Sequence, residues 1–400
     1  MREQRPSSRR QYHGWHSRSV RLVMLACLLL LGLAVLWQVR QRPRRLYEEA
    51  RILAPTNPTA AERLLEQAVA AAGGQFPEAE FLRCRLLAQL GQWDEALGGF
   101  SRIKNPSTLP ARELAELAAL AKSAGVLPLA EFALNAARTP GPHLPNVLRQ
   151  SIRLHLEVGQ HEQVLQECRA LLQIAPEDPV AWQVQGAIHL ERKRLPEAEA
   201  AFREALQRTS VVEQQRPMRE QLIRVLLDGG RAEDARAELE LLRGAGSLTA
   251  EARLMEAYVN RLEGHWDQAN ETVDWLLANA SALELQTRLL RAMLWLDQGQ
   301  PAKAAPDLEL VIARQPHNKE AHNKLAQAYR KLNRPEQALS HAETAQRLTE
   351  LSLELLAQED KLAADPGNEG LRQRVAELYE SLGQPAKAEQ LHRRRRVLVP

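Results

Sequence analysis

The chain is poor in aromatic and β-branched side chains, the residue types that favour β-strands. Phe, Trp and Tyr together make up 4% of its 400 residues. Ala, Leu, Glu, Arg and Gln dominate instead, and these rank among the strongest helix formers. The composition therefore argues against a β-rich fold and predicts an all-α protein.

Cysteine is also scarce, and the three cysteines are Cys27, Cys84 and Cys168. No two of them form a Cys-x-x-Cys pair, which excludes zinc and redox sites of that kind. A disulfide needs α-carbons within about 7 Å of each other. Cys84 and Cys168 fall in predicted helices that lie far apart along the chain, so we expect no disulfide between them.

The sequence has no recognisable catalytic motif. It contains no His-Glu-x-x-His, no Gly-x-Ser-x-Gly, no phosphate-binding glycine loop and no dinucleotide fingerprint. The eleven histidines are scattered without the spacing of metal ligands. Acidic residues of the predicted helices stand three or four positions from arginines, as on a solvated helix face. We therefore expect no cofactor, no metal and no enzymatic activity.

The formal net charge of +3 hides a strong asymmetry. Residues 1–45 contain ten arginines and a single acidic residue, Glu3, which gives this segment a charge of +9 and leaves −6 for the rest. Affinity for nucleic acids comes mainly from Lys and Arg side chains that neutralise phosphates. Because the body of the chain is acidic, we predict no nucleic-acid partner.

Residues 22–39 form a largely apolar run that no charged residue interrupts, LVMLACLLLLGLAVLWQV. As a helix, a run of this length spans roughly 27 Å, close to the hydrocarbon core of a bilayer at about 30 Å. Trp37 stands at one end, where an indole suits the headgroup region, and arginines flank both ends. We therefore predict a single transmembrane helix at 22–39, after a basic tail at 1–21 and before a basic linker at 40–45.

Two other interpretations of the N-terminal region stay open. A cleaved signal peptide would use the apolar stretch Leu22–Leu31, with the small residues Gly32 and Ala34 before the cut. Ser8–Tyr12 faintly resembles a twin-arginine export signal, although a basic cytoplasmic tail also accounts for these residues.

Arginine counts on the two sides of the apolar run predict its orientation. Six arginines precede the run and four follow it, and cytoplasmic flanks carry the greater positive charge. Abundant Arg and Ala with little Lys suggest a GC-rich bacterium. We therefore expect a single-pass protein of the bacterial inner (cytoplasmic) membrane, with a cytoplasmic N-terminus and residues 40–400 in the periplasm.

From residue 46 onward one local pattern recurs: Gly, any residue, a bulky residue or Pro, two further residues, and Ala. The small or β-branched anchor that closes the pattern, or a degenerate copy of it, stands at positions 61, 96, 130, 164, 198, 235, 269, 304, 338 and 388. Successive anchors are 34 or 35 residues apart, except for one interval of 37 and one of 50. A fixed period with a small residue at one phase predicts stacked helix–turn–helix units, because small residues let helices approach closely.

This period and phase resemble the tetratricopeptide repeat family, whose 34-residue pattern has Trp, Leu-Gly and Tyr, followed by Ala, Phe and Pro. Residues 179–212 match best. Trp182 takes the first aromatic place and Gly186 the close-packing glycine, while Ala198 and Phe202 take later places. The resemblance extends from residue 46 towards the C-terminus.

The resemblance implies a right-handed α-solenoid of about ten helix pairs, each stabilised by stacking on its neighbours. We expect this solenoid at residues 46–350, followed at 351–400 by an extra helix and a repeat-like C-terminal capping hairpin. Five glycines suit the left-handed residue that ends a helix. They are Gly91, Gly125, Gly159, Gly299 and Gly383.

Two irregular intervals interrupt the period. The interval of 37 adds three residues near Thr209–Pro217, which we expect to form a longer loop. The interval of 50 adds about half a repeat, and Leu348–Ala364 is expected to form one extended or extra helix that ends before Asp365. A hinge, a binding ledge or a plain insertion would each account for this addition.

In the family, the first helix of each pair lines a concave groove at its second, fifth, ninth and twelfth places. Carried onto this chain, these places predict a groove lined by Arg85, Arg149, Arg153, Gln183, Arg224, Asn323, Gln327 and Arg330. The arginines would form paired hydrogen bonds with carboxylates of an extended peptide or a chain terminus. Alternatively they are solvated or paired with nearby acids. These acids are Glu157, Glu191, Glu220 and Asp228.

The Lys and Asn combination of family members that clamp a C-terminal carboxylate is absent, which puts that specific ligand in doubt. Repeats without catalytic motifs predict a membrane-anchored scaffold or adaptor. It would bind or organise partner proteins in a cell-envelope complex, with a protein or peptide in the groove and the membrane contacted through residues 22–39. Two alternatives stay open: a non-catalytic subunit that presents substrates to a membrane protease or a polysaccharide synthase or export system, and an enzyme hidden within the repeats.

Overall fold

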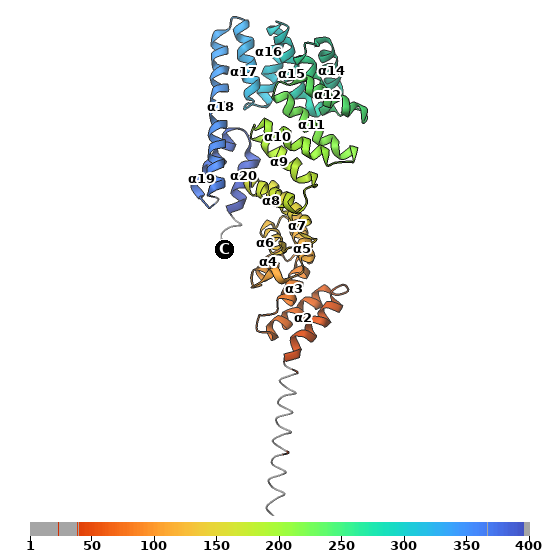
Figure 1. The fold of residues 1–400 in the computed structure, drawn as a ribbon. Coiled ribbons are helices and arrows are strands. Elements are labelled where there is room, and N and C mark those ends of the chain that lie inside the picture. The colour runs from red at the N-terminus through yellow and green to blue at the C-terminus, as the bar shows by residue number, and fades with distance from the viewer. Residues whose placement is uncertain (1–22, 24–37, 39, 366, 396–400) are drawn as a thin grey trace, which may run out of the picture. The chain divides into compact units, whose positions relative to one another are not determined.

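A computed structural model describes residues 23, 38, 40–365 and 367–395 (Figure 1). These residues form helices, turns and loops, with no strand among them, so the all-α prediction is confirmed. The described chain makes ten consecutive helix pairs, in agreement with the expected number. It divides into two compact units, Met1–Pro140 and Gly141–Pro400, and each is described by itself.

In the first unit, residues 40–53 are helical and pair with the next helix along the chain. The other helices of this unit are α2 (Pro58–Ala71), α3 (Pro77–Gln89), α4 (Trp93–Ser101), the short 3₁₀ turn η1 (Pro106–Thr108), α5 (Ala111–Ser123) and α6 (Leu127–Ala137).

The second unit contains the remaining seven pairs. Its helices are α7 (Leu144–Glu157), α8 (His161–Ile174), α9 (Pro179–Glu191), α10 (Leu195–Gln207), α11 (Val212–Asp228), α12 (Ala232–Gly244), α13 (Ala250–Leu262), α14 (Trp266–Asn279), η2 (Ser281–Leu283), α15 (Glu284–Asp297), α16 (Pro301–Arg314), α17 (Lys319–Lys331), α18 (Pro335–Ala364), α19 (Glu369–Ser381) and α20 (Pro385–Arg395).

The anchor positions of the repeat lie where the two helices of each pair meet. All ten of them are buried, with 3% exposure or less. Gly186 on α9 shows how close the helices come, because a Cβ added there would lie 2.9 Å from Cε1 of Phe202 on α10. Phe202 is itself fully buried. Small residues at these places therefore let large neighbours fill the space between helices.

The turn inside a helix pair requires a residue with positive φ. The five predicted turn glycines adopt such a conformation, which confirms that expectation: Gly91, Gly125, Gly159, Gly299 and Gly383 have φ between 66° and 78°. Two of the helix pairs have a residue other than glycine with positive φ at this turn. Lys193 has φ of 56° and Asn333 has φ of 57°. The lysine is the more strained of the two, because a left-handed backbone costs a residue with a long side chain about 1–2 kcal/mol.

The three additional residues near Thr209–Pro217 do not form a longer loop, so that expectation is wrong. α11 already begins at Val212 and is 17 residues long, with Pro217 inside it. Proline donates no amide hydrogen, so the carbonyl of Glu213, four residues earlier in the helix, lacks the amide partner that another residue would supply. The Gln215 side chain also donates a hydrogen bond to the Thr209 carbonyl and so holds the preceding turn against the helix.

α18 is a continuous helix of 30 residues, about twice the length of its neighbours. Its first half packs in the hydrophobic cluster of α15 to α17, which includes Ala338. Its second half contributes Leu355 to a separate cluster with α19 and α20, which also contains Val375 and Leu391. The chain therefore builds a small terminal core onto the extension of one helix, as the blue segments of Figure 1 show.

The predicted location in the bacterial inner membrane requires a correction. Among the described residues, no helix combines the length and the apolar character that crossing a membrane demands. α18 is long enough, but charged residues occur throughout it. The predicted transmembrane segment 22–39 falls outside the described residues except for Val23 and Gln38. The predicted single-pass inner-membrane location, with a cytoplasmic N-terminus and a periplasmic solenoid, is overturned by this finding.

Candidate binding surface

The helix contacts of the second unit identify its inner side. The first helices of successive pairs pack directly on one another, from α9 to α11, α13, α15 and α17. Comparable packing does not join the second helices α10, α12, α14 and α16 in this described part of the chain. A row of helix pairs curves toward the side on which its helices lie closer together. The first helices from α9 to α17 therefore line the concave side.

Arg149 of α7 is the predicted groove residue with the most buried partner. Its Nε donates a hydrogen bond of 2.7 Å to Oδ2 of Asp178, whose side chain is 2% exposed. The other oxygen of Asp178 accepts from the amide of Val180 and so caps α9. Asp178 thus ties the arginine to the start of the next pair, and Arg149 serves the stacking of repeats.

Arg85 lies on α3 in the first unit and is also paired. It forms an ion pair with Glu113 of α5 and lies 3.5 Å from a carboxylate oxygen of Glu116. Its guanidinium also lies over the ring of Phe81, 5.9 Å from the centroid. The two acids satisfy the arginine across adjacent repeats, which leaves it less available to a partner than its position in the repeat suggests.

Arg153 on α7 and Arg224 on α11 differ from these two. Both side chains are exposed, and neither forms an ion pair with any residue of the described chain. Counted from the start of the 34-residue repeat, with the anchors Val164 and Ala235 at its twentieth place, both arginines occupy the ninth place. Three of the four acids expected near the groove arginines have other partners: Glu191 pairs with Lys387, Asp228 pairs with Lys193, and Glu220 accepts a hydrogen bond from the hydroxyl of Thr249.

The other predicted residues lie on α9 and α17. Gln183 is half-buried on α9, and Gln327 is half-buried on α17. Asn323 and Arg330 are exposed on α17. The Nε of Arg330 donates a hydrogen bond of 3.3 Å to the carbonyl of Ala326 within its own helix, which leaves the guanidinium without a carboxylate among the described residues.

Tyr258 on α13 extends the inner surface with an aromatic ring. It is half-buried and packs against the clusters of α13 to α17. Burial first, and then the negative charge of Glu320 on α17, raise the pKa of Tyr258 to about 12. The phenol is therefore neutral at physiological pH and offers a hydrogen-bonding group beside apolar residues.

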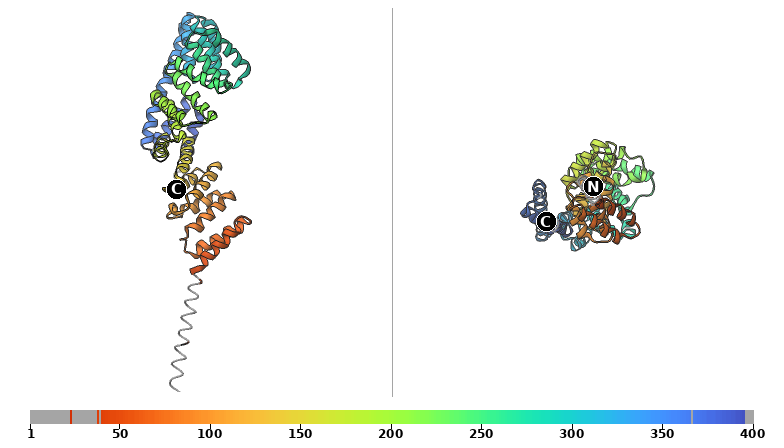
Figure 2. Two further views of the ribbon diagram at one scale, coloured as in Figure 1. Left: turned by 45° about the vertical axis from the view of Figure 1, so that its right-hand side comes forward. Right: turned by 90° about the horizontal axis from the view of Figure 1, so that it is seen from below.

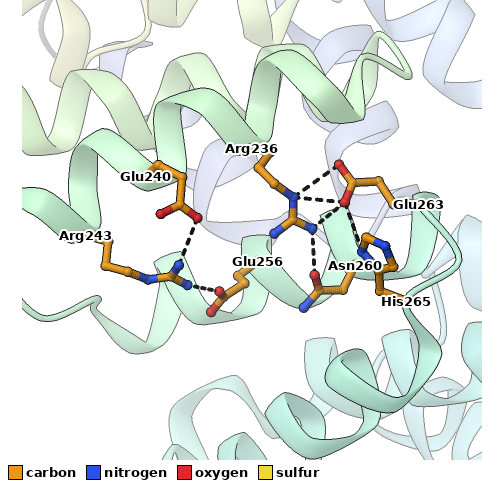
Figure 3. Close-up of polar contacts among 7 residues, drawn as sticks. All are labelled: Arg236, Glu240, Arg243, Glu256, Asn260, Glu263 and His265. Atoms are coloured by element: carbon orange, nitrogen blue, oxygen red, sulfur yellow. Dashed lines mark hydrogen bonds and ion pairs between the residues drawn. The ribbon is translucent and has the colours of Figure 1, made fainter.

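A network of ion pairs links α12 to α13 and the turn that follows (Figure 3). Arg236 donates to Glu263 at 2.9 Å and to Asn260 at 2.7 Å, while His265 lies 3.2 Å from the same glutamate. Hydrogen bonding to Glu263 raises the pKa of Arg236. Further along α12, Arg243 donates to Glu240 of the same helix and to Glu256 of α13. These charges are used in joining neighbouring repeats and are not free for a partner.

Sequence reasoning missed a buried polar cluster between α7 and α8. The hydroxyl of Ser151 donates to Oε1 of Glu167 at 2.7 Å, and Nδ1 of His155 donates to Oε2 at 3.0 Å. The three residues are at most 4% exposed. Its only signal in the sequence is that Ser151 and His155 stand four residues apart on a helix face that is otherwise apolar.

This cluster resembles a catalytic triad in composition but not in geometry. The nitrogen of His155 nearest to the Ser151 hydroxyl is Nδ1, at 3.4 Å. That same nitrogen donates to Glu167, so it cannot accept the serine proton as a general base. The burial of all three side chains also keeps substrates away. The cluster therefore stabilises the contact of α7 with α8.

Two cysteines within the described chain are buried and unpaired. Burial first, and then a neighbouring glutamate, raise the pKa of both Cys84 and Cys168 to about 12. Thiolates, not thiols, are the reactive species, so these cysteines are inert at neutral pH. The described residues also bring together no group of three His, Cys, Asp or Glu side chains that would hold a metal ion.

Comparison with known families supports the repeat assignment. The tetratricopeptide repeat family matches residues 152–211 and residues 296–349, which lie in the second unit. The chain contains tetratricopeptide repeats. Repeats of this family indicate a protein–protein interaction scaffold, and the family and its fold are generally non-catalytic.

One solved structure shows the same fold at low sequence identity, and others are more distantly similar. A tetratricopeptide repeat protein from Parabacteroides merdae is 15% identical, with a TM-score of 0.51, and the match covers 68% of this chain and 98% of that one. Human IFIT1, in a dimer with PPP-AAAA, is 14% identical with a TM-score of 0.40, covering 80% and 90% of the two chains. YrrB, described as having an unusual peptide-binding site, is 15% identical with a TM-score of 0.30, covering 45% and 91%. No curated protein matches the sequence.

Proposed function

We propose that this tetratricopeptide repeat protein is a scaffold that binds an extended, acidic segment of a partner protein along the inner side of its second unit. Arg153, Arg224 and Arg330 would contact the carboxylates of that segment. Tyr258 would lie beside its backbone or apolar side chains.

One observation carries this proposal. Many other arginines of the described residues face a carboxylate, as Arg149 and Arg236 do. Arg153, Arg224 and Arg330 are exposed on first helices and have no carboxylate partner among the described residues. Unpaired guanidinium groups on a concave surface favour acidic ligands, because they supply several hydrogen-bond donors in a planar fork.

The proposal is tested with a fluorescein-labelled dodecapeptide of repeating Glu-Ser-Gly units, whose binding is followed by fluorescence anisotropy. Arg224→Gln is expected to weaken binding about tenfold, since a hydrogen bond to a charged group contributes about 1.5–3 kcal/mol. Arg153→Gln and Arg330→Gln are expected to act in the same direction. Binding should also weaken as salt rises, because the contacts are exposed.

Arg314→Gln provides the matched control, since Arg314 is exposed at the end of the second helix α16 and away from the inner side. It should leave binding unchanged. A second peptide with Gln in place of Glu controls for charge. Equal losses from Arg224→Gln and Arg314→Gln, or equal binding of the two peptides, would contradict the proposal.

A further inference from the structure

A contact in the second unit joins residues that are 196 positions apart. Nζ of Lys387 on α20 donates a hydrogen bond of 2.9 Å to Oε1 of Glu191 at the end of α9. Nε2 of His161, at the start of α8, lies 3.6 Å from the other oxygen of that carboxylate. The C-terminal helix therefore returns to the first helices of this unit, as both side views show (Figures 1 and 2).

The same terminal segment also contacts the far end of the row. A Cβ added to Gly383, in the turn between α19 and α20, would lie 2.4 Å from Cδ2 of His317 in the loop before α17. Gly383 has φ of 71°, so this turn fits closely against that loop. The segment therefore touches α9 at one end of the inner row of helices and the start of α17 at the other.

Two kinds of interaction hold this segment, and they differ in strength. Leu355, Val375, Tyr379 and Leu391 form a hydrophobic cluster made only of residues from the second half of α18, α19 and α20. The contact with α9 instead consists of polar side chains. The segment is thus a small module with its own core, attached through α18 and closed onto α9 by an ion pair.

We propose that residues 351–391, which we call the C-terminal strap, close the curved row of helices α9 to α17 into a ring and open by releasing Lys387 from Glu191. The strap controls the access of a partner to the inner side. The control of partner access rests on the proposed function, whereas the opening and closing of the strap do not.

The closing contact is suited to reversible release. The side chains of Lys387 and Glu191 are 44% and 48% exposed, and exposed ion pairs are weak and screened by salt. Burial lowers the pKa of His161, so this imidazole adds little positive charge at neutral pH and Lys387 remains the main cation facing Glu191. An acidic partner that competes for Lys387 would loosen the same contact.

The test measures the distance between α9 and α20 in the full chain by pulsed electron–electron double resonance. Spin labels are attached at Arg194→Cys and Ala386→Cys, which are exposed positions next to Glu191 and Lys387. Cys27, outside the described residues, is replaced by serine. Cys84 and Cys168 can stay, because their burial keeps them unreactive toward the label.

The labelled chain that keeps both Lys387 and Glu191 is expected to give a narrow distance distribution. Lys387→Gln, or 1 M NaCl, should add a population at longer distance. Lys303→Gln on α16 is the control, because both lysines lie over an aromatic ring: Nζ of Lys387 is 5.3 Å from the ring centroid of Tyr379, and Nζ of Lys303 is 4.6 Å from that of Trp295. If the distance distribution stays unchanged both in Lys387→Gln and in 1 M NaCl, the proposal that the strap opens by releasing Lys387 is contradicted.

The effect on access is measured as the association rate of the Glu-Ser-Gly peptide. Lys387→Gln should raise this rate several-fold over that of the unmodified chain, and Lys303→Gln should not. Equal rates would overturn the control of access, even if the distance distribution changes. Failure of the peptide to bind either protein would count against the proposed function alone, because the distance measurement is made without it.

Discussion

The packing of Gly186 against Phe202 predicts the effect of a single methyl group. Gly186→Ala places a Cβ 2.9–3.0 Å from three atoms of a fully buried ring. The better helix propensity of alanine offsets only part of this, and we expect a net loss of about 1–3 kcal/mol in the free energy of unfolding. Urea denaturation monitored by circular dichroism measures it. Gly244→Ala, at the open end of α12, should be neutral or slightly stabilising.

A pair of histidines predicts how stability depends on pH. Nδ1 of His322 on α17 lies 3.0 Å from Nδ1 of His341 on α18. Nε2 of His322 lies 3.0 Å from the carbonyl of Pro316, to which it can only donate. When both rings are neutral, Nδ1 of His322 accepts the proton of His341. His341 also stacks on Tyr329, with centroids 5.7 Å apart.

The sign of the pH effect follows from this pair. Burial, and then the neighbouring His322, lower the pKa of His341, while Glu309 opposes the shift. A group whose pKa is depressed on folding contributes stability above its ordinary pKa and loses it as pH falls. Between pH 7.5 and 5, the intact chain should lose more stability in urea than His341→Gln. The exposed His143→Gln should follow the intact chain, and parallel curves for all three proteins would contradict the assignment.

At the scale of elements, the continuity of α18 predicts which parts of the chain unfold together. Ser352 lies between the half of α18 that packs with α15 to α17 and the half that packs with α19 and α20. Ser352→Pro removes an amide hydrogen bond and introduces a steric clash, which costs about 3 kcal/mol in a helix interior. Hydrogen exchange measured by mass spectrometry should quicken in residues 352–391 and stay slow in residues 285–338.

Ser352→Ala is the control for this substitution, because it removes only the hydroxyl that donates to the carbonyl of Leu348. It should leave exchange close to that of the intact chain. Faster exchange across α15 to α17 in Ser352→Pro would mean that the terminal core is required for the stability of the earlier repeats, against the separation of the two clusters.

At the scale of the whole molecule, the two compact units predict independent folding. The hydrophobic cluster around Ala61 and Leu65 lies within the first unit, whereas those of α7 to α20 lie within the second. Fragments 40–140 and 141–400 should both be helical, and their summed circular dichroism should match that of residues 40–400. A fragment 141–400 that melts without a cooperative transition would show that it depends on the first unit.

The periodic parts of the fold were predictable, because the same physical requirement recurs in every repeat. A buried helix crossing accepts only a small residue, so Ala96, Ala198 and Ala304 reveal the period directly. The course of the chain at the irregular intervals was not predictable. Three added residues near Pro217 can extend either a loop or a helix, and the contacts of the helical form, such as that of Gln215 with Thr209, appear only in the folded chain.

The candidate surface was predictable only in part. The phase of the repeat places Arg149 and Arg224 on comparable first helices, yet Asp178 neutralises the former and no described carboxylate neutralises the latter. The two arginines differ because Asp178, which caps the start of α9, lies beside Arg149. The contact of Lys387 with Glu191 left no sequence signal, because the curvature accumulated over many repeats decides which distant residues meet.

The length of α18 has a geometric consequence. A helix of 30 residues is a rod of roughly 45 Å, and each residue turns whatever follows it by about 100°. Adding or deleting one residue in its middle would therefore swing α19 and α20 around the rod and turn Lys387 away from Glu191. Seven added residues would nearly restore the angle, to within about 20°, but would shift the hairpin by about 10 Å along the axis. The contact of Lys387 with Glu191 therefore forms at only one length of α18.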